Sequence, residues 1–156
     1  MATGSDGGVP FTRQADALFA IANPTALFGD EHQDQGIDAD GDGRFEALAV
    51  DVTVVVSQPA TFTVAAELRK DALVLDATAA QFAAVAPGAQ AVRLRFDGAA
   101  IFQACAAGPY TVGSALLVDH AAGVVPADMA AVLHTTAAYS CNQFAEAEIF
   151  LPAIGR

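Results

Sequence analysis

The sequence contains no tryptophan and only two tyrosines among its 156 residues, so the aromatic platforms on which sugars and single-stranded nucleic acids stack are nearly absent. Basic residues are also scarce: seven lysines and arginines stand against 18 aspartates and glutamates, giving a formal net charge of −11. This charge argues against nucleic acid and anionic membranes as partners, because both are themselves negative. No apolar run approaches the roughly 18 residues that a membrane-spanning helix requires, so no membrane insertion is expected.

Familiar catalytic motifs are also missing. The sequence has no G-x-S-x-G element, no phosphate-binding glycine loop and no paired catalytic carboxylates at a strand end. The histidines His32, His120 and His134 share no metal-binding spacing, and we expect ordinary surface or edge residues that lie apart from one another. Of the three, His32 comes closest to a metal-ligand arrangement, because Glu31 and Asp34 lie beside it in the sequence. We therefore expect a protein that is not an enzyme.

The length fits one domain, and 54% hydrophobic against 16% charged residues indicates a folded chain. We expect residues 1–25 to be a leader or linker, in which only residues 15–22 have a helical periodicity, and residues 26–152 to form the folded module. The first ten residues carry Asp6 but no basic stretch, so they are not typical of a signal peptide. If the protein is exported, we expect its signal to lie outside this chain.

Alternating side chains give the strongest strand signal. Apolar residues occupy every second position over residues 48–56 and again over residues 62–68, as in strands with one buried face. Pro59 lies between the two runs and cannot donate a ladder hydrogen bond, so they predict an antiparallel hairpin around a turn. The same alternation, extended to later strands, predicts these core residues: Leu48, Val50, Val52, Val54, Phe62, Val64, Leu68, Val92, Leu94, Phe96 and Val112.

Shorter runs bounded by Gly, Pro and Asp predict further strands, the last two from weaker signals, over residues 72–75, 92–97, 110–118, 132–136 and 148–151. Residues 77–85 show a weak helical periodicity instead. Short strands with turn signals about every ten residues are typical of a sandwich. The sequence therefore predicts an all-β fold, a single antiparallel two-sheet β-sandwich of about seven to nine strands with an acidic loop before the first long strand.

This acidic loop, residues 38–46, carries the sharpest chemical signal. Asp38, Asp40 and Asp42 alternate along it, and their charges repel one another unless the chain curls around a cation. They take the first, third and fifth positions of a calcium loop, the carbonyl of Arg44 takes the seventh, and Glu46 takes the ninth. We therefore predict a Ca²⁺ site formed by these five residues.

The loop departs from an EF-hand at its twelfth position, Ala49, where an EF-hand has a bidentate glutamate, and a strand follows in place of a helix. The upstream carboxylates Asp30, Glu31 and Asp34 are candidates to complete the metal's shell. The alternative interpretation is a solvated acidic turn, which is common in acidic proteins. The alternation together with the glycine after Asp42 favours calcium.

The two cysteines, Cys105 and Cys141, match no zinc or redox spacing. One interpretation is a disulfide that ties the loop before Gly108 to the last strand region, and the other is a pair of buried free thiols. An extracellular, calcium-rich setting favours the disulfide. In the chain-entropy treatment, a bridge across this separation (141 − 105 = 36 residues) stabilises the fold by roughly 4 kcal/mol.

Taken in order, several motifs resemble a β-sandwich repeat module of secreted and cell-surface bacterial and archaeal multidomain proteins. The resemblance covers residues 28–144 and rests on the acidic loop and on short motifs at residues 28–30, 46–50, 87–88, 94–101, 108–110 and 136–139. It implies a calcium-stabilised, immunoglobulin-like accessory module without catalytic activity, with the five loop residues as metal ligands. Cys105 and Cys141 depart from the residues expected in this family, glycine and an aromatic residue, and their joint appearance fits a pair acquired as a bridge.

Two functions follow as expectations. The first is a non-catalytic, calcium-stabilised structural or adhesive module of an exported multidomain protein, secreted or at the cell surface. Its partners would be other domains of the parent chain or cell-surface components. The alternative is a carbohydrate- or peptide-binding accessory module attached to a secreted enzyme, for which Tyr110, Tyr139 and some of the ten phenylalanines would have to supply the binding surface. The sequence makes no prediction of the oligomeric state.

Overall fold

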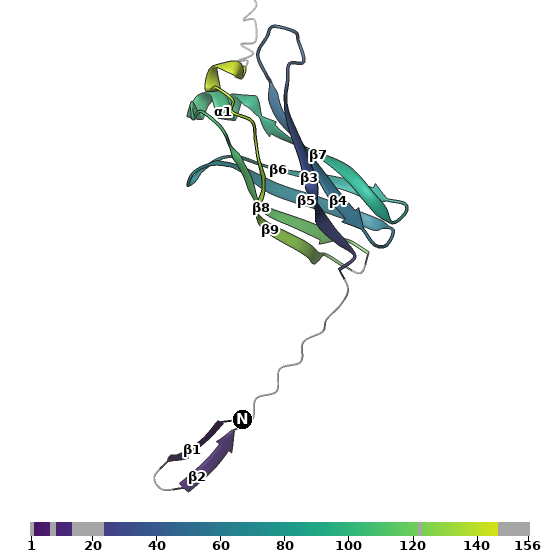
Figure 1. Cartoon of the computed structure of the whole chain (residues 1–156), viewed down its shortest axis with the longest axis vertical. Helices are drawn as coiled ribbons and strands as arrows, with labels where there is room; N and C mark the ends of the chain where they lie inside the picture. Colours follow the sequence, from purple (N-terminus) through teal and green to yellow (C-terminus); the bar gives the residue numbers. More distant parts are fainter. Residues whose placement is uncertain (1, 7–8, 14–23, 122, 147–156) are drawn as a thin grey trace, which may run out of the picture.

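Two antiparallel sheets lie in separate layers in the computed structural model, which describes residues 2–6, 9–13, 24–121 and 123–146 (Figure 1). The three-stranded sheet has the order β3-β4-β7 and the four-stranded sheet the order β6-β5-β8-β9, so the predicted all-β, two-sheet sandwich is confirmed with seven strands. Their bounds are β3 Ala26–Ile37, β4 Ala47–Val56, β5 Ala60–Lys70, β6 Leu73–Ala84, β7 Gly88–Asp97, β8 Thr111–Asp119 and β9 Val125–Thr135.

Two short helical segments complete the sandwich. Helix α1 (Gly98–Ala104) connects β7 to β8, and the single 3₁₀ turn η1 (Cys141–Gln143) follows β9. In the segment expected to be a leader or linker, β1 (Ala2–Asp6) and β2 (Val9–Arg13) pair as a hairpin. The helical periodicity at residues 15–22 and the strand signal at 148–151 lie outside the described residues. In the part of the chain that the structure describes, no helix has the length and apolar character to cross a bilayer.

The core between the sheets is built from the alternating positions. All eleven side chains predicted for it are buried, and Val50, Val52 and Val54 of β4 have no exposed surface. Three further fully buried residues lie outside the strands of the structure: Ile101 of α1, Tyr110 and Phe144. Burial of apolar surface at roughly 25 cal/mol per Å² is the main force that holds the two layers together.

The predicted hairpin of residues 48–68 is wrong, although both of its strands exist. β4 pairs with β3 and β7, whereas β5 pairs with β6 and β8, so the turn around Pro59 carries the chain from one sheet to the other. Alternation shows which face of a strand is buried, but it does not show which strand lies beside it. β4 therefore faces the layer that contains β5.

Residues 77–85 are not helical, which corrects a second expectation. Residues 77–84 belong to β6, which pairs with β5 from Ala60 opposite Ala84 to Lys70 opposite Leu73. Alanine favours helices by less than about 1 kcal/mol per residue, and tertiary packing routinely overrides so weak a preference. The acidic loop precedes β4 as predicted, but another long strand, β3, precedes the loop.

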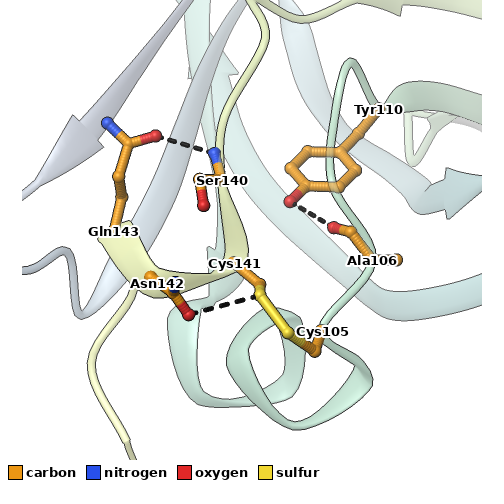
Figure 2. Close-up of a disulfide and its surroundings, with 7 residues drawn as sticks. All are labelled: Cys105, Ala106, Tyr110, Ser140, Cys141, Asn142 and Gln143. Atoms are coloured by element: carbon orange, nitrogen blue, oxygen red, sulfur yellow. Dashed lines mark hydrogen bonds between the residues drawn. A yellow bond between two sulfur atoms is a disulfide. The ribbon is translucent and has the colours of Figure 1, made fainter.

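The connection from α1 to β8 is fixed at two points (Figure 2). The hydroxyl of the fully buried Tyr110 donates to the carbonyl of Ala106 at 2.8 Å, four residues upstream. A tyrosine whose hydroxyl bonds in this way to the backbone a few residues upstream is called a tyrosine corner. At the end of α1, Cys105 forms a disulfide with Cys141 of η1, with their Cα atoms 4.8 Å apart. The predicted bridge is thus confirmed, and it is consistent with an oxidising environment.

Candidate metal centre

The acidic loop gathers four carboxylates at one point. Asp38, Asp40, Asp42 and Glu46 each offer one oxygen, and these four oxygens lie within 4.8 Å of one another. The three aspartates are exposed and Glu46 is half-buried, so water and ions reach the group freely. The structure therefore brings together the four side chains that the spacing singled out, and the group can hold a metal ion.

Backbone amides inside the loop impose this convergence. Asp38 accepts hydrogen bonds from the N–H groups of Gly41 and Gly43 at 2.7 and 3.0 Å, one on each carboxylate oxygen. Both glycines have positive φ, +80° and +90°, a conformation that side-chain-bearing residues rarely adopt. The N–H groups of Asp42 and Arg44 donate in turn to the aspartate two residues earlier, at 3.0 and 2.7 Å. The chain thus curls with its carboxylates turned inward.

The exit of the loop is held from three sides. The N–H of Glu46 donates to the carbonyl of Ile37 at 2.9 Å, which closes the loop at the base of β3 and β4. The carbonyl of Glu46 accepts from the N–H of Gly98, the first residue of α1, at 2.8 Å. A Cβ at Gly98 would lie only 2.4 Å from the carbonyl oxygen of Phe45, so this close approach requires glycine.

The segment after η1 supplies the third contact. The N–H of Phe45 donates to the carbonyl of Gln143 at 2.7 Å, and its carbonyl accepts from the N–H of Ala145 at 2.9 Å. The ring of Phe45 packs edge-on against those of Phe144 and Tyr139, with centroids 5.8 and 6.2 Å apart. The loop, α1 and η1 consequently meet at one end of the sandwich (Figure 1).

A hollow of about 570 Å³ lies beside the acidic group at this end. Besides loop residues it is lined by Asp97, Ala99, Ala145 and Glu146, and among the described residues Arg44 is the one cation in its lining. Asp97 also caps α1, because its carboxylate accepts from the N–H of Ala99 at 2.9 Å. Asp97 and Glu146 were not anticipated as neighbours of the loop, since only the pairing of distant segments places them there.

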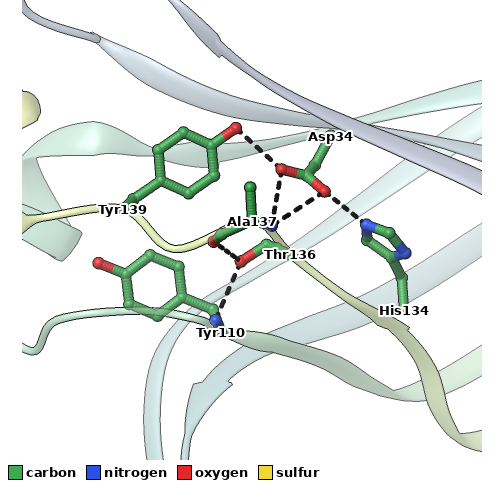
Figure 3. A network of polar contacts seen from close by, with 6 residues as sticks. All are labelled: Asp34, Tyr110, His134, Thr136, Ala137 and Tyr139. Carbon is green, nitrogen blue, oxygen red and sulfur yellow. Dashed lines mark hydrogen bonds and ion pairs between the residues drawn. The ribbon is translucent and has the colours of Figure 1, made fainter.

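Asp34, a candidate to complete the metal's shell, is bound elsewhere (Figure 3). Its carboxylate accepts from His134 Nε2 at 2.6 Å, from the Tyr139 hydroxyl at 2.8 Å and from the Ala137 N–H at 3.2 and 3.3 Å. Burial raises the pKa of Asp34, but the hydrogen bonds from His134, Tyr139 and Ala137 outweigh burial and hold this pKa below 3.8. Burial, followed by the bond to Asp34, raises the pKa of Tyr139 to about 12.

The expectation that the histidines lie apart is wrong for two of them. The rings of His32 and His134 meet edge-on with centroids 6.1 Å apart, because β3 and β9 lie against each other across the two layers. His32 Nδ1 accepts from the Thr53 N–H at 3.3 Å. Burial, and then the proximity of His134, lower the pKa of His32 below 6.5. His120 stands elsewhere, with its Nε2 2.9 Å from the Thr63 hydroxyl.

The assignment of the acidic loop as a candidate metal site rests on the geometry of its carboxylates. Comparisons of the chain with models of protein families, with curated proteins and with solved structures find no match. The resemblance to a calcium-binding repeat module therefore stays a prediction, and the sandwich, the disulfide and the acidic group are properties of the chain itself.

Proposed function

We propose that the chain is a non-catalytic structural or adhesive module of an exported multidomain protein, stabilised by Ca²⁺ in the acidic loop. The observation that carries this proposal is the convergence of Asp38, Asp40, Asp42 and Glu46 within 4.8 Å. Their donors are all oxygens, which suit hard cations and not the softer metals that prefer nitrogen or sulfur. The carbonyl of Arg44 is the fifth proposed ligand.

The number and kind of the proposed ligands favour calcium over magnesium. Ca²⁺ takes six to eight oxygens in flexible geometry, which suits a curled loop that offers four carboxylates and a backbone carbonyl. Mg²⁺ is usually bound through only one or two carboxylates and keeps several waters. Magnesium also gives up its waters reluctantly and demands near-octahedral geometry. We therefore expect magnesium to substitute poorly.

Calcium at this position stabilises more than the loop. The ion joins ligands on both arms of the β3–β4 connection, and the loop's exit is bonded to α1 and to the segment after η1. An ion that binds only the folded state raises the free energy of unfolding by RT ln(1 + [L]/Kd), about 2.7 kcal/mol at a hundredfold excess over Kd. The disulfide supports export, since such bonds persist in oxidising compartments.

The two tyrosines give little support to the alternative function, a carbohydrate- or peptide-binding accessory module. Tyr110 has no exposed surface, and the hydroxyl of Tyr139 is engaged by Asp34. Neither presents a free ring and hydroxyl on which a sugar could stack. Retention of the protein on insoluble polysaccharides in the presence of calcium would favour this accessory-module alternative over the structural one.

Thermal unfolding with calcium and with chelator tests the metal site. At a hundredfold excess over Kd, calcium should raise the melting temperature by about 5–10 °C. Asp40→Asn should abolish most of this rise while preserving the loop, because the amide oxygen can still accept from the Asp42 N–H. Asp71→Asn in the β5–β6 turn is the matched control, since Asp71 is exposed at φ +52°, which asparagine tolerates. Equal melting temperatures with calcium and chelator would leave the loop as an acidic turn.

A further inference from the structure

The outer face of the four-stranded sheet carries very little charge, which is unusual for a surface of this acidic chain. Side chains on β5 alternate, so those between the buried Phe62, Val64, Ala66 and Leu68 point away from the core. The residues paired with them on β6, β8 and β9 point the same way. Three successive rows across β6, β5, β8 and β9 are Ala77-Glu67-Gly113-Val132, Ala79-Ala65-Leu116-Met129 and Gln81-Thr63-Val118-Pro126.

These twelve positions, the β6–β9 face, contain a single charged residue, Glu67. Its partner is Arg69, two residues along β5, whose Nε lies 3.4 Å from the Glu67 carboxylate. Arg69 lies just outside the twelve positions, and its ion pair offsets the one negative charge of the face. Its apolar side chains on β9 stand in solvent, with Met129 73% exposed and Val132 64% exposed, whereas on β8 Leu116 is half-buried and Val118 is 8% exposed. Large exposed apolar side chains beside one another on a sheet are typical of an interaction surface.

The outer face of the other sheet is a contrast within the same molecule. Its central row is Gln33-Asp51-Arg93, and the guanidinium of Arg93 donates two hydrogen bonds of 2.7 Å to the Asp51 carboxylate. Antiparallel sheets with one solvated face usually carry such polar residues there. The β6–β9 face departs from this rule although both sheets belong to one chain.

Charge indicates which partner fits. The chain carries a formal charge of −11, so two copies repel each other over most of their surfaces. On the β6–β9 face the one carboxylate is paired with Arg69, so a second copy can approach this face with little of that repulsion. It offers no aromatic ring for a sugar and no excess of basic residues for an anionic surface. We propose that this face binds the same face of a second copy, forming a two-fold symmetric dimer.

The size of the face sets the area that such a dimer can bury. Four strands spaced about 4.8 Å apart span roughly 19 Å, and residues 61–69 of β5 extend over about 30 Å. Stacking two copies would cover about 600 Å² on each, or about 1,200 Å² in total, at the lower limit of specific interfaces. We therefore expect a dimer whose population depends on the protein concentration.

Sedimentation equilibrium of the full chain over a range of concentrations tests this proposal. The weight-average mass should rise from 15.9 kDa toward twice that value. Val132→Glu places a negative charge on the β6–β9 face in both copies and should weaken association at least about tenfold. Val55→Glu is the matched control, because Val55 is a strand valine, 45% exposed, on the outer face of the other sheet. It should associate like the parent chain.

Two results would overturn the proposal. One is a parent chain that stays at 15.9 kDa at every concentration. The other is association that Val132→Glu and Val55→Glu weaken equally, because it would then depend on net charge or on another surface. All samples contain chelator, and circular dichroism checks that both variants are folded. Because no calcium is bound in these samples, the result does not depend on whether the acidic loop binds calcium.

Discussion

Replacing Asp34 with alanine removes one acceptor that three donors share at the seam between β3 and β9. The donors are His134 Nε2, the Tyr139 hydroxyl and the Ala137 N–H, and all belong to β9 or to the segment that follows it. The Asp34 side chain is only 9% exposed, so water cannot simply take its place. We expect the substitution to loosen the contact between the two layers at this edge.

The expected loss of folding stability depends on whether each donor can hydrogen-bond to water once the carboxylate is gone. His134 can turn toward solvent because its side chain is 17% exposed, and the Ala137 N–H lies in an exposed bond. The half-buried Tyr139 hydroxyl has less access to water. Hydrogen bonds to a charged group contribute about 1.5–3 kcal/mol, and removing one partner of a buried pair costs about 3–5 kcal/mol. Partial rehydration places the loss near 3 kcal/mol, or about 6–12 °C in melting temperature.

A double-mutant cycle isolates the contact between Asp34 and the Tyr139 hydroxyl. Asp34→Ala, Tyr139→Phe and the combined variant are unfolded with urea, and the coupling between the two sites should be about 1–2 kcal/mol. Tyr139→Phe removes the hydroxyl and keeps the ring against Phe45, so packing is preserved. A loss below about 0.5 kcal/mol in Asp34→Ala, the usual range for an exposed surface site, would refute this reasoning.

Acid supplies an independent check on Asp34. A carboxyl whose folded-state pKa lies below its ordinary 3.8 stabilises the fold above that pH, and this contribution is lost as the pH falls through the folded-state value. The parent chain should therefore approach Asp34→Ala in stability at strongly acidic pH. An undiminished difference there would mean that the charge of Asp34 is unimportant.

Two further predictions concern the disulfide and His32. Replacing Cys105 and Cys141 together with serine should lower the free energy of urea unfolding by about 2–4 kcal/mol, and reducing agent should then have no further effect. Because the folded-state pKa of His32 is lowered, the unfolded chain binds the proton more readily, and stability should fall as the pH drops below 6.5. His32→Gln should flatten this part of the urea-midpoint profile, and an unchanged slope would assign it to another group.

Side-chain alternation was sufficient to predict β4, β5 and β7, because their inward residues are apolar and their outward residues mostly are not. The sequence did not predict β3, because not all of its inward-facing residues are apolar. Its inward positions include His32 and Asp34, which are satisfied by Thr53 and by His134 and not by apolar packing. A polar pair in a half-buried strand hides the period that identifies it. The partners that make this pair acceptable lie on other strands, Thr53 21 residues from His32 and His134 100 residues from Asp34.

The acidic loop was readable from the sequence because its structure is local. Its turns are hydrogen bonds between residues two to five positions apart, so spacing alone implies the convergence of Asp38, Asp40 and Asp42. The pairing of strands is a long-range property, which is why the sheet membership of β5 was mistaken. Helix α1 was missed because seven residues capped by Asp97 are too few to show a helical period.

The disulfide has a mechanical consequence for a module that is loaded along its chain. Cys105 and Cys141 are 36 positions apart and close a covalent ring that includes all of β8 and β9. Tension applied outside the ring passes through the sulfur bridge, so those residues cannot extend even when their sheet gives way. At about 3.3–3.6 Å per residue, the bridge withholds roughly 120–130 Å of contour length. A chain loaded in this way would therefore reach a shorter maximum extension under oxidising conditions than after reduction of the bridge.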